Sequence, residues 1–475
     1  MDIRFFFVTL QKILEHKIME AHDTEYKSIW KDDYLISVCA FANTKGGTLF
    51  IGKNDDGTTI DISDPKAIKH KLGLTDADAK YYLDLIPKKI ISLLGIVADV
   101  TLHRTATGNF IEITVEQYFN AISYLGEYYV RHGSSNQILK GATLSAFLLK
   151  KQGKHWDSVP VSNVKIEDLS LSALQRFRTE ATRSGRVDGE VLNDSTEHLL
   201  HDLKLIDDAT NNLKRAAVLL FHPDPEKFFI GAYVKIGFFR KDDDDLAFQD
   251  EIHGSLMEQI EKTYDLLKSK YITYAISYEG ISRREKPTFP TDALRESLLN
   301  AIAHKDYTSG APIQISVYPD RIIFWNSGRL PQSIPIETLF EKHPSVPYNP
   351  NIANALFRCG DIEAWGRGYR KIIKAVMKHK QLPPTIRDVG GLMLTYYADA
   401  HTQIKEETGD ERIAQIVEYV IKKGSISNSE VQNVLKTSKP TATRLLKQAS
   451  QWLIKQGERG LGTIYVTKWK EVADS

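Results

Sequence analysis

A polar pair on one face of a predicted helix is the first feature that could do chemistry. Residues 292–307 read DALRESLLNAIAHKDY, and Glu296 and Asn300 stand four positions apart in this segment, so they share one helix face. That face also carries Ala303, His304 and Tyr307, and the opposite, core-facing side carries Leu294, Leu298 and Ile302. Asn300 can bind Mg²⁺ through its amide oxygen, and Glu296 can orient or deprotonate an attacking water. The pair suits a nucleoside triphosphate, although similar pairs occur on ordinary solvated helices.

Two glycine-bearing segments follow this helix. Residues 313–318 and 321–325 alternate as the two strands of a hairpin, which ends in the glycine turn 326–328. Gly366 and Gly368 then precede an amphipathic helix, whose free amides and positive end can hold a phosphate. Each segment alone also occurs as an ordinary turn or helix, but their order favours a nucleotide site.

This order of segments resembles the three boxes of the GHKL ATPases, the class that includes gyrase, MutL and the histidine kinases. Residues 287–377, and 343–372 in particular, are similar to the divergent GHKL domain of RecG-related or divergent-AAA transcriptional regulators. The resemblance implies a Bergerat-type α/β sandwich that binds ATP and Mg²⁺, with Glu296 as the base for hydrolysis and Asn300 as the metal ligand. It assigns the other cofactor contacts to His304, Asn326, Gly328, Gly366 and Gly368.

Asn326 departs from the GHKL pattern, in which an Asp usually accepts the adenine amino hydrogen. An Asn can accept this hydrogen through its carbonyl oxygen, but its NH₂ group must then find another partner. Adenine selectivity and turnover therefore stay open, and we expect ATP binding with at most a weak ATPase activity. The sequence contains no Gly-x₄-Gly-Lys-Ser/Thr phosphate loop, which argues against a helicase.

The first third of the chain carries a second ordered set of acids, glycines and basic residues. Its pieces are, in chain order, the segment EAHDTEYK at 20–27, a predicted helix at 32–43, Gly46-Gly47, a strand at 48–52, an acidic turn at 54–57 and a strand YYVRHG at 128–133. Over about residues 10–150 this set resembles the Schlafen/AlbA-like DNA-binding domain. The resemblance implies an α+β fold with DNA or RNA as the partner.

In Schlafen proteins that cut RNA, three carboxylates form the nuclease site, and the resemblance assigns them to Glu20, Glu25 and Asp55. Three acids can hold a divalent metal that activates water against a phosphodiester, so a metal-dependent nuclease is one alternative. The other is that the acids pair with Lys27 and Arg131 at a surface that binds without cutting. Phosphate contacts are expected from the basic residues Lys27, Lys45, Arg131 and Lys140.

The last 65 residues predict a third module. The polar stretch 401–410 is interpreted as a linker, and apolar residues recur at helical spacing over 413–421. Residues 427–430 form a capping signal, a helix is predicted at 440–453, and 457–466 form a glycine-tipped wing. These elements resemble a winged helix-turn-helix, which implies DNA contacts from Lys439, Thr441, Thr443, Arg444, Lys447 and Arg459. The alternative is a winged helix that contacts protein.

Composition bounds the class without deciding the function. A length of 475 residues predicts about three domains, and the net charge of +1 neither supports nor excludes nucleic acid. The two cysteines, Cys39 and Cys359, argue against a disulfide scaffold and a Cys-based zinc site and favour a reducing, cytoplasmic setting. We expect no membrane helix and no export signal.

The fold class expected from these motifs is α/β multidomain. The predicted domains are a Schlafen/AlbA-like domain at 1–155, a connecting α/β region at 156–285, a GHKL-type domain at 286–400 and a winged helix at 411–475. Within the connecting region we predict helices at about 171–182 and 195–203, strands at 216–221 and 233–239, and a solvated acidic loop at 242–245.

The combined interpretation is a DNA-binding transcriptional regulator in which ATP occupancy modulates how the nucleic-acid-binding domains engage DNA. The GHKL resemblance also implies a homo-oligomer, because GHKL domains commonly pair when ATP closes their lid. Two rival interpretations stay open. One is the metal-dependent nuclease, acting as a defence effector, and the other is a degenerate ATPase that serves as a scaffold for protein contacts.

Overall fold

The computed structural model describes residues 22–279, 281–330, 334–339, 344–363, 366–457 and 463–470. These residues divide into two compact units, Met1–Lys154 and His155–Ser475, and each unit is described by itself. Both cysteines are buried and free, and no disulfide joins them. Within the described ranges, no helix has the length and apolar character that crossing a membrane requires.

The first unit is built on a four-stranded sheet in the order β1-β2-β4-β3. Its strands are β1 (Thr24–Lys27), β2 (Gly47–Ile51), β3 (Asp99–Arg104) and β4 (Asn109–Val115); β1 and β2 are parallel and the other pairs antiparallel. Alternate residues of β4 are buried, because α2 (Leu35–Asn43) and α4 (Asp76–Leu94) pack on one face of the sheet. Thr75 and Asp78 form a capping box that begins α4.

The predicted helix at 32–43 is present as a 3-10 turn, η1 (Asp32–Tyr34), followed by α2, and the predicted strand at 48–52 is β2. The remaining elements of this unit are α3 (Pro65–His70), the small sheet of β5 (Ser123–Tyr124), β6 (Glu127–His132) and β7 (Ser135–Ile138), and α5 (Gly141–Lys151). The helices of this unit thus pack on one face of its sheet and leave the other face open, which is the predicted α+β fold.

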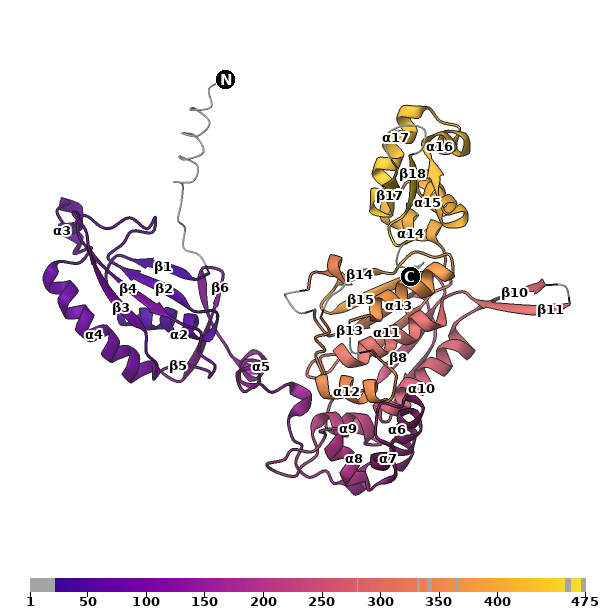
Figure 1. Ribbon diagram of the computed structural model, residues 1–475, viewed down its shortest axis with the longest axis horizontal. Coiled ribbons are helices and arrows are strands. Elements are labelled where there is room, and N and C mark those ends of the chain that lie inside the picture. Colours follow the sequence, from indigo (N-terminus) through magenta and orange to yellow (C-terminus); the bar gives the residue numbers. More distant parts are fainter. Residues whose placement is uncertain are drawn as a thin grey trace. The chain divides into compact units, whose positions relative to one another are not determined.

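The second unit contains a six-stranded sheet in the order β14-β15-β13-β12-β8-β9. Its strands are β8 (Val234–Phe239), β9 (Leu246–Ile252), β12 (Ile313–Val317), β13 (Arg321–Asn326), β14 (Thr385–Asp388) and β15 (Leu392–Tyr397). Figure 1 shows the helices α10 (Leu256–Leu266), α11 (Thr291–His304) and α13 (Gly368–Lys378) layered against this sheet, with α12 (Pro350–Arg358) beside them. The predicted hairpin 313–325 and the α/β sandwich are therefore present.

Helices α6 (Leu171–Ser184), α7 (Gly189–Asn193), α8 (Thr196–Asp202) and α9 (Arg215–Phe221) complete the core of this unit. The predicted strand at 216–221 is wrong, because these residues form α9. All six of its residues from Ala216 to Phe221 are fully buried, and α6, α10 and α12 surround the helix. A short apolar run buried on every side has no amphipathic period, so its pattern suits a strand or a helix equally well.

A two-stranded hairpin, β10 (Tyr274–Glu279) and β11 (Ser282–Pro287), extends from the second unit in Figure 1. Short helical turns connect the larger elements. They are η2 (Trp156–Ser158), η3 (Ile166–Asp168), η4 (Pro225–Lys227), the π-helical η5 (Leu267–Tyr271), η6 (Ile336–Thr338) and η7 (Ala449–Gln451). One hydrophobic core runs from Val164 to Tyr396, so residues on both sides of the predicted border at 285 share it.

The C-terminal elements follow in the order helix, helix, strand, helix, helix, strand, strand. They are α14 (Ala400–Thr408), α15 (Glu411–Lys423), β16 (Ile426–Ser427), α16 (Asn428–Leu435), α17 (Lys439–Gln448), β17 (Leu453–Gln456) and β18 (Ile464–Thr467), with sheet order β16-β18-β17. The predicted capping signal is a complete capping box between Ser427 and Glu430. The helix predicted at 440–453 ends earlier, at Gln448.

The predicted linker at 401–410 is wrong, because most of it is the helix α14. Asp399 caps this helix by accepting a hydrogen bond from the Thr402 amide at 2.8 Å. Ile404 is fully buried, and the buried Gln403 side chain donates to the Pro383 carbonyl oxygen at 3.1 Å. Two apolar residues, Ala400 and Ile404, and the buried Gln403 amide hold this otherwise polar helix in place.

Candidate nucleotide site and nucleic-acid surfaces

A cavity lies between the polar face of α11, the end of β13 and the start of α13. The empty space within it is about 1040 Å³, a figure that includes open solvent at its mouth. All seven residues that the sequence assigned to a nucleotide line this cavity: Glu296, Asn300, His304, Asn326, Gly328, Gly366 and Gly368. Three segments that are distant in sequence therefore meet at one place, and the roles of these residues stay predictions.

Glu296 and Asn300 lie one turn apart on α11 and contact each other. The Asn300 Nδ2 atom donates to Glu296 Oε1 at 3.4 Å, so the Asn300 carbonyl oxygen is not the atom directed at the carboxylate. Glu296 is only 6% exposed, and this burial raises the pKa of its carboxyl, against the attraction of Lys371 and Arg295. A buried carboxylate with a raised pKa is suited to take a proton from water.

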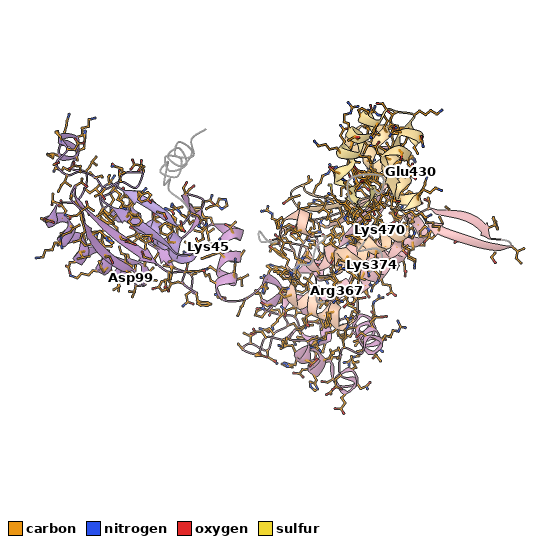
Figure 2. The ribbon with its side chains drawn as sticks, turned by 45° about the horizontal axis from the view of Figure 1, so that its top comes forward. Lys45, Asp99, Arg367, Lys374, Glu430 and Lys470 are labelled. Carbon is orange, nitrogen blue, oxygen red and sulfur yellow. The ribbon has the colours of Figure 1, made fainter. Side chains whose placement is uncertain are left out.

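The start of α13 closes against this pair at a glycine. A Cβ at Gly368 would lie 2.5 Å from Glu296 Oε1 and 3.1 Å from Asn300 Nδ2, so a larger residue there would push the ends of these two side chains aside. Arg367 precedes Gly368 as the N-cap residue of α13, and Lys374 lies farther along the same helix (Figure 2). The beginning of α13 therefore lines the cavity beside a carboxylate and a carboxamide.

The end of β13 is fixed against the end of α11. The Gly328 amide donates to Asn326 Oδ1 at 2.8 Å, and a Cβ at Gly328 would lie 2.0 Å from the His304 carbonyl oxygen. Asn326 is 4% exposed. Around it the cavity lining is apolar, with Phe324, Leu330, Ile334, Leu339, Leu392 and Leu394. This end of the cavity suits a flat, largely apolar ring with a polar edge.

Tyr307 does not join the polar face of α11, contrary to the prediction. The helix ends at His304, and the Tyr307 ring is 3% exposed and stacks on Trp156 at 5.9 Å. Its hydroxyl donates to the Ile302 carbonyl oxygen at 3.2 Å. Conversely, the sequence did not single out Glu363 and Tyr369, which also line the cavity and flank the two predicted glycines.

In the first unit, the Glu25 carboxylate forms ion pairs with two cations, and its role as a metal ligand stays a prediction. Glu25 is 5% exposed; its Oε1 lies 3.0 Å from Lys27 Nζ and its Oε2 accepts from Arg131 at 2.6 Å. The predicted alternative, in which acids pair with these two cations, describes this residue. Lys45 and Lys140 are exposed (Figure 2 labels Lys45).

Asp55 lies in an exposed turn. A Cβ at Gly57 in this turn would lie 3.3 Å from the ring of Tyr26, whose side chain points opposite to that of Glu25 along β1. Glu20 lies outside the described residues. Among the described residues, no group of three or more His, Cys, Asp or Glu side chains is placed to hold a metal ion.

Helix α17 separates its apolar and basic residues as predicted. Leu445 and Leu446 are buried, and so is Ala449 in the turn η7 that follows. The side chains on the opposite face, Lys439, Thr443, Arg444 and Lys447, are exposed, and Thr441 is half-buried. The Thr443 hydroxyl also accepts from Asn428 Nδ2 at 3.0 Å, which ties α17 to α16. Arg459 lies outside the described residues, so the structure gives it no position.

Two family models match separate parts of the chain. Residues 20–140 match the model described as "Schlafen, AlbA_2", and residues 310–395 match the model described as "Putative ATP-dependent DNA helicase recG C-terminal". The chain joins a Schlafen/AlbA_2 domain to a RecG C-terminal ATPase-type domain. The ATPase-type match includes Asn326 and Gly368 but begins after Glu296 and Asn300.

Two solved structures are similar to the chain at low identity. The DIP2311 protein from Corynebacterium diphtheriae is 19% identical, over 99% of this chain and 98% of that chain, with a TM-score of 0.46. The N-terminal domain of a RecG-related protein from Nitrosomonas europaea is 19% identical, over 28% of this chain and 94% of that chain, with a TM-score of 0.19. Curated proteins give no match.

Proposed function

We propose that the cavity between α11, β13 and α13 binds a nucleoside triphosphate with Mg²⁺. We propose ATP as this nucleotide because the matched family model describes an ATP-dependent protein. The observation that carries this proposal is the meeting of Glu296, Asn300 and Gly368, a buried carboxylate, a carboxamide and the glycine at a helix start. A phosphate chain needs amide donors and a metal ligand at the same place, and these three residues supply that combination.

The residues present fit a magnesium ion held with the phosphates. Asn300 directs its NH₂ group toward Glu296, so its carbonyl oxygen remains as the hard ligand that Mg²⁺ prefers. Gly368 leaves free the space that a Cβ would fill beside both side chains. Bound Mg²⁺ would neutralise phosphate charge, and Glu296 would orient or deprotonate the attacking water.

We further propose that the protein is a DNA-binding transcriptional regulator whose nucleotide occupancy modulates its grip on DNA. The exposed basic face of α17, with Arg444 and Lys447, supports duplex binding by a winged-helix module. The Schlafen/AlbA_2 domain supplies a second nucleic-acid surface, with Lys45 and Lys140 exposed. The engagement of Glu25 by two cations favours binding without cleavage at that surface. Pairing of two copies through the ATPase-type domain is part of the proposal.

The first prediction tests the nucleotide site in the full-length protein by calorimetry and phosphate release. Asn300→Ala should lose Mg²⁺-dependent nucleotide binding, whereas Glu296→Gln should bind normally and lose hydrolysis, because a general base acts on the chemical step. Burial raises the pKa of Glu296, so its carboxylate becomes protonated at a higher pH than an exposed Glu would. As the pH is lowered, the hydrolysis rate of the wild type should therefore begin to fall at this higher pH.

Asn433→Ala is a matched control for Asn300→Ala, because Asn433 is exposed on α16, away from the cavity. It should leave nucleotide binding unchanged. A wild-type protein that binds no nucleoside triphosphate in the presence of Mg²⁺ would overturn the proposal and favour the scaffold alternative.

A further inference from the structure

Helix α13 has its first residue at the nucleotide cavity. A Cβ at this residue, Gly368, would lie 2.5 Å from Glu296 Oε1, and the helix ends at Lys378. Its 11 residues span about 16 Å at a rise of about 1.5 Å per residue. The helix buries one side, with Ile372 and Val376 fully covered, and packs on α11. Packed interiors are nearly incompressible, so a displacement at the start of α13 is passed to its end.

A buried glutamine anchors the chain just after α13. Gln381 is 6% exposed, and its backbone amide donates to the Val376 carbonyl oxygen at 2.9 Å. Its Nε2 atom donates to two further carbonyl oxygens, those of Thr288 and Ala398, both at 2.7 Å. Ala398 lies between the end of β15 and Asp399, the N-cap residue of α14. One side chain therefore ties the end of α13 to the beginning of α14.

The next residue, Leu382, belongs to the core of the C-terminal module, which comprises α14 to β18. Leu382 is 3% exposed and shares a hydrophobic cluster with Ile404 of α14, Val417 of α15 and Leu445 of α17. Every other described residue of this buried cluster lies at or after Ala400. The apolar side of α13 belongs instead to the large core that contains the ATPase-type domain. Leu382 is thus the point at which the chain from α13 enters the core of the module.

Helix α14 extends this connection to the end of the basic helix α17. Gln403 of α14 donates through Nε2 to the carbonyl oxygen of Pro383, the residue after Leu382, at 3.1 Å. Glu407, one turn later on α14, accepts a hydrogen bond from Gln451 Nε2 at 2.9 Å. Gln451 lies in η7, the turn that follows α17. Side-chain hydrogen bonds therefore join the segment 381–383 to α14, and α14 to the helix whose exposed basic face is the proposed DNA surface.

We propose that α13 transmits nucleotide occupancy to the C-terminal module, with Gln381 and Leu382 as the joint between them. This inference rests on the proposed nucleotide site and on the proposed binding of DNA. A phosphate chain bound beside Gly368 contacts the start of α13 and displaces the helix against α11. Packed helices in switching proteins shift by about 1–2 Å. Leu382 carries such a shift into the core of the module, which repacks and moves α17.

The test measures how ATP with Mg²⁺ changes the dissociation constant of the full-length protein for a mixed-sequence DNA duplex. In the wild type this change should be at least about 5-fold. Leu382→Ala should remove the change, although the variant still binds ATP alone and DNA alone. Leu453→Ala is the matched control, because Leu453 is also 3% exposed in the same cluster but lies on β17, within the module. It should destabilise the module to a similar extent and keep the effect of ATP.

Two results would overturn the role of α13 and leave the nucleotide site standing. If ATP still changes DNA affinity in Leu382→Ala, the effect reaches α17 by another route, such as pairing of two copies. If both leucine variants lose the effect, the stability of the module explains the loss. A wild type that binds ATP without any change in DNA affinity rejects the regulation as a whole, and one that binds no ATP rejects the nucleotide site itself.

Hydrogen exchange of the wild type decides the question if Leu382→Ala does not fold. Binding of ATP with Mg²⁺ should change the exchange rates of amides in the last turn of α13 and in α14, because both lie on the proposed route. If calorimetry shows that ATP is bound and these amides exchange as they do without it, α13 does not transmit nucleotide occupancy.

Discussion

Both carboxylate oxygens of Glu25 are engaged by cations, one by Lys27 at 3.0 Å and the other by Arg131 at 2.6 Å. The side chains of Glu25 and Arg131 are 7% and 1% exposed, so neither charge is satisfied by water. A carboxylate in these surroundings has little capacity left for a divalent metal, but its removal would leave a guanidinium buried without its carboxylate. Glu25 therefore acts first on the stability of its unit.

The second prediction concerns this ion pair. Glu25→Ala should lower the local free energy of unfolding of the first unit by about 3–5 kcal/mol, because it leaves the buried Arg131 without its carboxylate. Hydrogen exchange of the β1 and β2 amides in the full-length protein measures this change. Asp55→Ala, in an exposed turn, is the control. It should change the local free energy of unfolding by no more than about 0.5 kcal/mol.

If the β1 and β2 amides of Glu25→Ala and Asp55→Ala are equally protected from hydrogen exchange, Glu25 does not stabilise the first unit as predicted. The same pair of variants also sharpens the nuclease question. Loss of cleavage in Glu25→Ala could reflect unfolding, whereas Asp55→Ala keeps the fold. If the wild type cuts RNA in Mn²⁺ and Asp55→Ala does not, the nuclease alternative gains support.

Helical spacing predicted Glu296 and Asn300 as neighbours because both lie within one unbroken helix. The same spacing failed for Tyr307, because α11 ends at His304 and the next residue, Lys305, has an extended backbone with φ −59° and ψ 139°. Periodicity gives the face of a residue only while the helix continues. The partners of Glu25 followed from charge alone, but their distances required the fold.

At the scale of elements, the close contact between α11 and α13 depends on a glycine, Gly368, which has no side chain. The third prediction is that Gly368→Ala weakens nucleotide binding at least about 10-fold, because its Cβ would lie 2.5 Å from Glu296 Oε1 and would displace this carboxylate from its place in the site. Titration of the variant by calorimetry, beside a thermal unfolding scan, separates lost binding from lost folding.

Gly189→Ala is the matched control for this substitution. Gly189 also begins a helix, α7, but a Cβ there meets nothing within 4 Å. Alanine at this position should change the free energy of unfolding by no more than about 1 kcal/mol and leave nucleotide binding unchanged. If Gly368→Ala binds nucleotide as the wild type does, the close approach of α13 is not required at the site.

Elements with a clear period were predictable, and those without one were not. The hairpin of β12 and β13 alternates buried and outward residues, and α16 begins with a capping box, so both could be read from sequence. Helix α9 is buried all round and α14 buries few apolar residues, so tertiary packing rather than local pattern determines both. This difference explains why one was predicted as a strand and the other as a linker.

At the scale of the whole molecule, contacts across long stretches of sequence join the region before residue 285 to the ATPase-type domain. Asp157 is fully buried and accepts hydrogen bonds from the amides of Asn351 at 2.7 Å and Ile352 at 3.1 Å, near the beginning of α12. Arg186 donates to the carbonyl oxygens of Phe357 and Ile362, both at 2.9 Å. Motifs gave the order of the domains, but such contacts have no local signal, so the shared core was not predictable.

The last prediction concerns coupling between the nucleotide cavity and the basic face of α17. If occupancy modulates DNA binding, nucleotide should change the dissociation constant for duplex DNA by about 5- to 150-fold, the range of typical allosteric couplings. Thermodynamic linkage then requires DNA to change the nucleotide dissociation constant by the same factor. Both constants are measured at one fixed salt concentration, because phosphate contacts make DNA affinity strongly salt-dependent.

Two double variants locate the DNA end of this coupling. Arg444→Ala with Lys447→Ala removes two exposed cations of α17 and should weaken DNA binding, flatten its salt dependence and abolish the effect of DNA on nucleotide affinity. Lys422→Ala with Lys423→Ala removes the same charge from the end of α15 and should do much less. If nucleotide and DNA bind independently in the wild type, the regulatory proposal is ruled out. A ligand with equal affinity for two conformational states does not shift the equilibrium between them.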